Sequence, residues 1–214
     1  RLLARGARFR VDGEVVRDIA LAASGLLNTR VGGESVHPPA PLYLYKPPAS
    51  FGAKDWDIDT DDARYRRGLY TFRFRSVPYP MLQVFDTPAG NAPCTRRDVS
   101  NRPLQALTTL NEDLFFECAS ALGELIIREG GLTDEARVRY AFERCVTRSP
   151  SKFEMRTLTK YLDRQRERIG KGELDSAAIT AVLPGSPIMD TDEYAAWILL
   201  SRVLLNLDET IVRQ

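Results

Sequence analysis

The amino-acid sequence predicts a mainly α-helical protein, an irregular helical bundle with a long proline- and aromatic-rich loop segment. Three observations support this prediction. Apolar residues recur at helical spacing through most of residues 103–214, signals for helix starts and ends separate these stretches, and prolines crowd residues 38–48. The 214 residues suit a single domain, 1–214. We expect residues 1–102 to contribute one helix and a loop or ribbon segment, and residues 103–214 to form the bundle.

The first half of the chain contains one predicted helix. Apolar residues recur every three or four positions over Asp12–Leu27, which indicates a helix there. The prolines of residues 38–48 favour polyproline II or an irregular surface loop, because proline fixes φ and lacks a backbone donor. The acidic segment 51–62 continues as loop, and we expect its Trp56 to be buried.

Two short segments between the prolines and the bundle are candidates for strands. The segment 64–75 alternates aromatic and polar side chains near its end, which favours an extended chain, although part of its spacing also fits a helix face. The apolar segment 81–85 is bounded by Pro80 and by turn residues. The two segments could pair as a short two-stranded ribbon.

Helix signals follow one another beyond Asn101. Ser151 and Glu154 have the spacing of a capping box, in which each side chain satisfies a free backbone N–H of the other residue. Gly130 and Gly131 end one helix, and the last helix is expected to reach Ile211. These signals predict four or five antiparallel-type helices. Their starts are marked by Pro103, Asn111, Thr133, Ser151 and Asp190.

The residue inventory excludes several kinds of chemistry. His37 is the only histidine, so a multi-histidine metal site is not available, and we interpret His37 as a loop imidazole. Cys94, Cys118 and Cys145 lie too far apart for a C-x-x-C or haem-attachment motif, so no metal and no covalent haem are expected in this chain. We expect Cys118 and Cys145 to be core residues. No apolar run reaches the length of a membrane-spanning helix.

Positive charge is concentrated between Ala63 and Arg102. This segment carries eight arginines and two aspartates, whereas the whole chain has a net charge of +1. Arginines that alternate with aromatic residues can hold a phosphate, sulfate or carboxylate while the rings stack on a base or a sugar. Alternatively, these arginines pair with the five aspartates between Asp55 and Asp62 and brace that loop. The acidic loop argues against a nucleic-acid partner.

A second polar set gathers where a loop leads into the helix at Pro103. Asp86 is its one candidate general base, and its alternative role is an Asx-turn before Pro88. The alternative role of Asn101 is a helix cap. The members of the set are Asp86, Arg96, Arg97, Asn101 and Gln105.

Four ordered blocks of sequence carry a resemblance to a known family. They read GARFRVDGEVVRDIALAASGLL, YRRGLYTFRFRSVPYP, VFDTPAGNAPCTRRDVSNRPLQALTTLN and LLNLDETIVRQ. Together they resemble a planctomycete-specific C-terminal domain of unknown function, found in large multi-domain cytochrome-c-type proteins of planctomycetes and related bacteria. Thr87 and Arg102 depart from the pattern of that family, and no catalytic residue can be transferred from it.

The resemblance implies that the chain is the C-terminal fragment of a larger protein in the periplasm or cell envelope. Haem would then be carried by an upstream domain and not by this chain. The implied partners are upstream domains of the same polypeptide or other envelope proteins. The matched polar positions form a candidate surface for anion or saccharide binding or for domain docking. These positions are Arg66, Arg67, Asp86, Arg96, Arg97, Asn101 and Gln105.

Two hypotheses of function follow. The first is a non-catalytic interaction or ligand-binding module, with an acidic glycan as a ligand. The second is part of a polysaccharide-acting enzyme whose active site is completed by an upstream domain. A deep cleft in which Asp86 faces Arg96 or Arg97 and has a raised pKa would favour the enzyme. Arg96 and Arg97 bound to backbone carbonyls or to acidic loop residues would favour the module.

Overall fold

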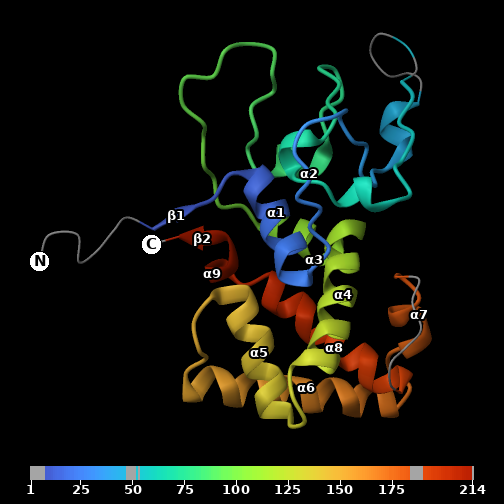
Figure 1. Ribbon diagram of the computed structural model, residues 1–214, viewed down its shortest axis with the longest axis vertical. Helices are drawn as coiled ribbons and strands as arrows, with labels where there is room; N and C mark the ends of the chain where they lie inside the picture. Colours follow the sequence, from blue (N-terminus) through green and yellow to red (C-terminus); the bar gives the residue numbers. More distant parts are fainter. Residues whose placement is uncertain (1–7, 47–51, 53, 184–189, 214) are drawn as a thin grey trace, which may run out of the picture. The chain divides into compact units, whose positions relative to one another are not determined.

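Helices dominate the chain, which confirms the predicted fold class (Figure 1). The computed structural model describes residues 8–46, 52, 54–183 and 190–213. Two short strands in this part of the chain, β1 (Phe9–Arg10) and β2 (Val212–Arg213), pair in antiparallel register. The α-helices are α1 (Gly13–Ser24), α2 (Pro80–Val84), α3 (Pro103–Asn111), α4 (Asp113–Glu129), α5 (Asp134–Val146), α6 (Lys152–Gly170), α7 (Ser176–Thr180), α8 (Thr191–Leu205) and α9 (Asp208–Ile211).

The chain divides into two compact units. Unit 1 comprises residues 1–21, 26–108 and 211–214, and unit 2 comprises residues 22–25 and 109–210. The ribbon of β1 and β2 belongs to unit 1, where it pairs residues from near the two ends of the chain. The Val11 N–H extends the pairing by donating to the Ile211 carbonyl at 2.9 Å.

The predicted ribbon between residues 64–75 and 81–85 is wrong. Residues 80–84 form helix α2, because Pro80 at the first helical position presets φ and the single turn buries Met81 and Leu82. The segment 64–75 contains two 3₁₀ turns, Asp62–Tyr65 and Gly68–Tyr70. Its extended part pairs with Val36, whose N–H donates to the Tyr70 carbonyl at 2.8 Å and whose carbonyl accepts from the Phe72 N–H.

Helix α1 confirms the helix predicted over Asp12–Leu27, although it ends earlier, at Ser24. Gly25 follows with φ of +79°, a left-handed conformation that ends many helices. Gly68 lies so close to the first turn of α1 that an added Cβ would come within 2.8 Å of the Glu14 carbonyl oxygen. The glycine therefore allows the segment after Arg67 to run directly against α1.

The proline-rich segment holds an aromatic core in unit 1. Trp56 is buried as predicted, and its ring stacks on Tyr45 and Tyr79 with centroids 4.7 and 5.8 Å apart. Trp56 Nε1 donates to the Pro38 carbonyl and Tyr79 Oη to the Pro39 carbonyl, both at 2.9 Å. The prolines lack N–H donors, yet their carbonyls satisfy the polar atoms of buried rings.

Short local signals set the helix starts of unit 2. Thr133, Ser151 and Asp190 each cap a helix through the side chain, as predicted. The capping box is complete, since Ser151 Oγ accepts from the Glu154 N–H and the Glu154 carboxylate accepts from the Ser151 N–H. The last helix is shorter than predicted. α8 ends at Leu205, and Ile211 lies in the separate helix α9.

Helix α8 lies at the centre of unit 2 and packs against α4, α6 and α7. Trp197 and Ile198 are completely buried. On α4, an added Cβ at Gly123 would lie 3.3 Å from Ile198, so the glycine lets α4 approach α8 closely. Cys118 and Cys145 are buried, as predicted. Burial raises the pKa of the Cys145 thiol to about 12, so it remains protonated at neutral pH.

Helices long and apolar enough to cross a bilayer are not found among the described residues. In the same part of the chain, no group of three or more histidine, cysteine, aspartate and glutamate side chains is placed to hold a metal ion.

Candidate functional site

Asp86 lies at the end of α2 and closes the neck of the loop 87–99. The end of α2 is stabilised by the Thr87 N–H, which donates to the Leu82 carbonyl at 3.0 Å, and this leaves Asp86 at a left-handed φ of 61°. The Asp86 carboxylate accepts from the N–H and the hydroxyl of Ser100, both at 2.8 Å. Because Asp86 precedes this loop and Ser100 follows it, these hydrogen bonds hold the two ends of the loop together.

Two further side chains complete the cluster, which we call the loop neck (Arg10, Asp86, Ser100 and Gln105). Arg10 Nη2 donates to Asp86 Oδ2 at 2.6 Å, and Arg10 Nε donates to the Ser100 carbonyl at 3.1 Å. Gln105 Nε2 donates to the Val84 carbonyl at 3.0 Å and lies 3.4 Å from Asp86 Oδ2. The Arg10 and Asp86 side chains are 8% and 12% exposed, so the ion pair is nearly buried.

The electrostatics of the loop neck keep Asp86 ionised. Burial alone would raise the pKa of its carboxyl. The hydrogen bonds from Ser100 and the charges of Arg10 and Arg102 outweigh burial and bring the pKa below its ordinary value. A carboxylate with four donor atoms and a lowered pKa is a weak proton acceptor at neutral pH.

Arg97 links the loop to the first turn of α1. Its Nη1 and Nη2 donate to the two oxygens of Glu14 at 2.8 and 3.2 Å, and Nη1 lies 3.5 Å from Asp12. Burial would raise the pKa of Glu14, but the hydrogen bond and charge of Arg97 and the charge of Arg73 lower it below its usual range. Arg73 braces the same loop by donating to the Pro88 carbonyl.

Arg66 and Arg67 are held by unit 1 itself. The buried Arg66 side chain donates to the carbonyls of Glu34, at 2.7 Å, and Gly32, and its guanidinium lies 3.8 Å from the centre of the Tyr70 ring. Arg67 Nε donates to the Asp18 carboxylate at 3.2 Å. The interpretation that these arginines pair with the acidic loop is therefore incorrect for both of them, because Arg66 binds backbone carbonyls and Arg67 pairs with a carboxylate of α1.

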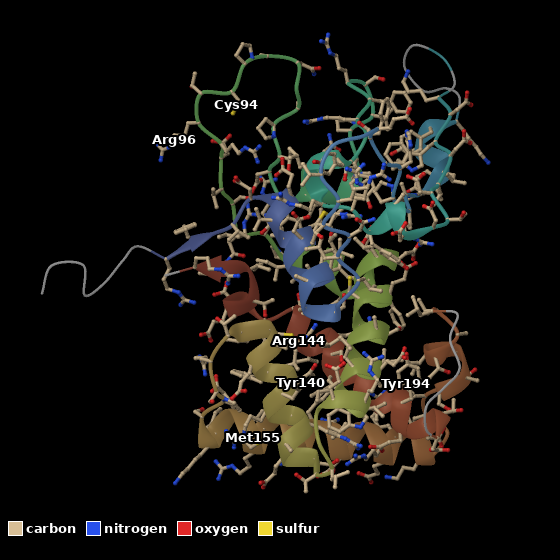
Figure 2. All side chains as sticks on the ribbon, viewed as in Figure 1. Cys94, Arg96, Tyr140, Arg144, Met155 and Tyr194 are labelled. Atoms are coloured by element: carbon tan, nitrogen blue, oxygen red, sulfur yellow. The ribbon has the colours of Figure 1, made fainter. Side chains whose placement is uncertain are left out.

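Two candidate residues, Arg96 in the loop and Asn101 just after the loop neck, face solvent. The Arg96 and Asn101 side chains are exposed, and the structure gives neither of them a side-chain hydrogen bond within the described ranges. Figure 2 shows Arg96 on the loop with its side chain pointing outward. Residues 89–99 are all exposed, so the loop held by the loop neck is accessible to solvent along these residues.

Sequence reasoning missed several residues that complete these clusters. Nothing in the neighbouring sequence marks Arg10, Glu14 or Ser100 as a site residue. Arg10, for example, is 76 residues from Asp86, and a pair so far apart leaves no pattern of spacing in the sequence. Arg17 did carry a local signal, since it precedes Ala20 by three positions and so lies on the buried stripe of α1. It is completely buried, and its guanidinium donates to the carbonyls of Arg64, at 2.6 Å, and Arg66.

A small pocket with a mixed polar and apolar wall lies in unit 1. It has a volume of about 180 Å³. Glu14 and Arg73 supply charged groups to its wall. Thr71 and Thr87 also line it, but their hydroxyls are buried and have no hydrogen-bond partner among the described residues. The remaining wall is formed by Gly68, Leu69, Pro78, Tyr79, Leu82 and Gln83. We call this site the α1 pocket.

The architecture defines a small, mainly helical module with a braced loop and a pocket. The profile of the PSD1 family, described as a protein of unknown function (DUF1553), matches residues 1–162. The chain belongs to this family. Neither the curated proteins nor the solved structures contain a match to it.

Proposed function

We propose that the chain is a non-catalytic binding module of a larger exported cytochrome-c-type protein and that its ligand is an acidic saccharide. The observation that carries the proposal is the loop neck, in which the best candidate base, Asp86, is fully used to hold the ends of an exposed loop. Compact loops closed at their ends are frequent sites of recognition. An enzymatic role for Asp86 would require breaking the cluster that positions the loop.

The α1 pocket supports a saccharide as the ligand. Its volume of about 180 Å³ is below that of pockets for drug-sized molecules and suits a single sugar ring. The Glu14 carboxylate offers acceptors at this wall, and the Arg73 guanidinium offers donors. A sugar presents many hydroxyls that both donate and accept hydrogen bonds, so it complements this wall.

Arg96 supports an acidic group on that ligand. It adjoins Arg97, which binds Glu14 in the wall of the pocket. An anion near the Arg96 guanidinium would form a charge-assisted, bidentate pair. The four sequence blocks given above support the cytochrome-c context, the upstream haem and the extracytoplasmic location. Docking to an upstream domain would use the same exposed loop.

Binding of a galacturonic acid tetrasaccharide, measured by titration calorimetry, tests the proposal. We expect Arg96→Gln to weaken binding about tenfold, which corresponds to about 1.4 kcal/mol, whereas Arg128→Gln, an exposed arginine of unit 2, should leave it unchanged. Absence of binding by the unmodified chain, or equal binding by Arg96→Gln, would contradict the proposal.

The larger context has its own test. The complete parent protein and the present chain would be produced side by side, fractionated to locate them in the cell, and assayed for haem spectra and for tetrasaccharide binding. We expect haem only in the parent, recovery outside the cytoplasm, and binding by both. Saccharide turnover that occurs only in the parent would instead favour the alternative of a shared active site.

A further inference from the structure

A second surface, in unit 2, has the features of a docking groove. It lies between α5 and α6 and has a volume of about 490 Å³. Figure 1 shows the two helices one above the other at the foot of the view, and Figure 2 marks Met155 on α6. The groove is independent of the loop neck and of the α1 pocket, since its wall comes from unit 2 alone. The lining residues are Glu135, Arg139, Pro150, Ser151, Lys152, Met155, Arg156, Thr159, Lys160 and Asp163.

Four cationic side chains of this groove lack acidic partners. Arg139, Lys152 and Lys160 are exposed and form no hydrogen bond or ion pair with any described residue. The Arg156 guanidinium packs over the exposed ring of Phe153, 6.0 Å from its centre, and forms no ion pair within the same part of the chain. The four cations therefore outnumber the two carboxylates of the groove, Glu135 and Asp163, and leave it with an excess of positive charge.

Other arginines of unit 2 are arranged differently. Arg148 binds both Glu154 and Glu209, and Arg166 binds both Asp134 and Glu193. In these pairs, an arginine that links two helices of unit 2 is paired with carboxylates from both of them. The contrast indicates that the four cations of the groove have a role other than bracing.

The spacing of the cations costs stability in the isolated chain. Lys152, Arg156 and Lys160 follow one another at intervals of four residues, so they lie on one face of α6 about 6 Å apart. Like charges at this spacing destabilise a helix instead of supporting it. A ligand of opposite charge would remove this repulsion.

An extended peptide matches that spacing. Alternate residues of an extended chain point to the same side about 6.7 Å apart, so three alternating acidic side chains span nearly the same length as Lys152, Arg156 and Lys160. Arg139, on α5, faces the groove from the other wall. The half-buried Pro150 and Met155 add apolar surface that suits intervening side chains.

The charge of the groove changes along its length, which argues against a uniform polyanion. Arg166 of α6 binds Asp134 at the start of α5 and lies 3.5 Å from Asp163, so Glu135, which follows Asp134, and Asp163 line the same end of the groove. These two carboxylates would repel a continuous chain of negative charge. A peptide can instead place a basic or neutral residue there, so a polypeptide fits the pattern better than an acidic glycan.

From these observations we infer that the α5/α6 groove binds an extended acidic peptide segment of a partner protein. The acidic side chains would pair with Arg139, Lys152, Arg156 and Lys160, and the end of the segment facing Glu135 and Asp163 would be neutral or basic. This inference goes beyond the saccharide site and does not depend on it.

Fluorescence anisotropy of the 214-residue chain with a labelled decapeptide of alternating glutamate and serine, ended by one lysine, tests the inference. We expect binding that weakens as salt is raised. The double variant Arg156→Gln, Lys160→Gln should bind about tenfold more weakly, because each exposed charge pair contributes modestly. The matched control Arg128→Gln, Lys171→Gln removes the same charge from exposed positions outside the groove and should bind as the unmodified chain does.

Three outcomes would overturn the inference. They are failure of the unmodified chain to bind the peptide, equal binding by the groove variant, and equal weakening by the control variant. A galacturonic acid octasaccharide would be titrated in parallel. If it binds more tightly than the peptide and its binding falls with Arg156→Gln, Lys160→Gln, the occupant is a glycan and not a peptide. Loss of octasaccharide binding with Arg96→Gln alone would instead reflect the proposed saccharide site in unit 1 and leave the peptide result unaffected.

Discussion

At the scale of single residues, the polar side chains of unit 1 serve mainly to fix its irregular backbone. Arg17 and Arg66 are buried and bind backbone carbonyls. Asp86 and Gln105 close a loop. Irregular segments have few ladder hydrogen bonds, so buried polar side chains must satisfy their carbonyls and N–H groups. Within the arginine-rich segment, Arg66 and Arg73 meet this need. Arg75, Arg96 and Arg102 are exposed instead, and of these Arg96 is the one proposed to bind a ligand.

Replacement of Asp86 by asparagine should destabilise unit 1. Asparagine tolerates the left-handed φ of 61°, so the change removes the charge without adding backbone strain. It leaves the nearly buried Arg10 guanidinium without its carboxylate, and we expect a loss of about 2–3 kcal/mol in the free energy of unfolding. Urea denaturation followed by Trp56 fluorescence, with Trp197→Phe in both the variant and its reference, would measure it. Asp98→Asn, an exposed aspartate of the same loop, is the control, and equal stability of the two variants would contradict the assigned role.

The candidate site could be predicted from the sequence only in part. Asp86, Arg97 and Gln105 were identified because polar residues cluster in one block of sequence, and all three do lie in polar clusters. Their partners Arg10 and Glu14 were not identified, because tertiary pairing between distant segments has no local signature. The sequence therefore showed some of the polar residues that belong to the site. Their partners, which decide whether a residue braces the fold or is free to bind a ligand, became known only from the structure.

At the scale of secondary-structure elements, the long helices formed by interactions between residues close in sequence were predicted correctly, and the ribbon formed by distant residues was not. Helices α5 and α6 were expected from their period and caps, both of which are local. Helix α4 was expected from its period, but the cap predicted at Asn111 is wrong, since Asn111 ends α3 and Glu112 precedes α4. Helix α2 was mistaken for a strand because five residues are too few to show a helical period. The ribbon was misplaced because the pairing of Phe9–Arg10 with Val212–Arg213 joins the ends of the chain, and no turn signal announces it.

The capping box of α6 permits a direct test of such a local signal. Ser151→Ala removes the hydroxyl that accepts from the Glu154 N–H at 3.2 Å, and we expect a loss of about 1 kcal/mol in the free energy of unfolding. Thermal unfolding followed by circular dichroism would measure it. Thr157→Ala, at an exposed position within α6, should be neutral or stabilising because alanine is the better helix former. A Ser151→Ala variant as stable as Thr157→Ala would show that the cap contributes little.

At the scale of the whole molecule, both units depend on carboxylates that are ionised in the folded state. In unit 2, hydrogen bonds from Arg148 and from Ser151 lower the pKa of Glu154 to about 2. In unit 1, the pKa of Asp86 is lowered as described above. A carboxyl with a lower pKa in the folded than in the unfolded state binds fewer protons when folded, so its stabilising contribution is complete above its ordinary pKa and declines as the pH falls.

We therefore expect the free energy of unfolding to fall steadily as the pH is lowered from about 5 to about 2. Trp56 and Trp197 are buried and lie in different units, so the single-tryptophan variants Trp197→Phe and Trp56→Phe report on unit 1 and unit 2, respectively. Urea denaturation of both variants at several pH values would measure the trend. The acid dependence of unit 1 should be smaller when Asp86→Asn is added to the Trp197→Phe variant, because that carboxyl no longer takes up a proton. Stability that stayed constant between pH 6 and pH 3 would show that the carboxylate hydrogen bonds described here do not contribute to folding.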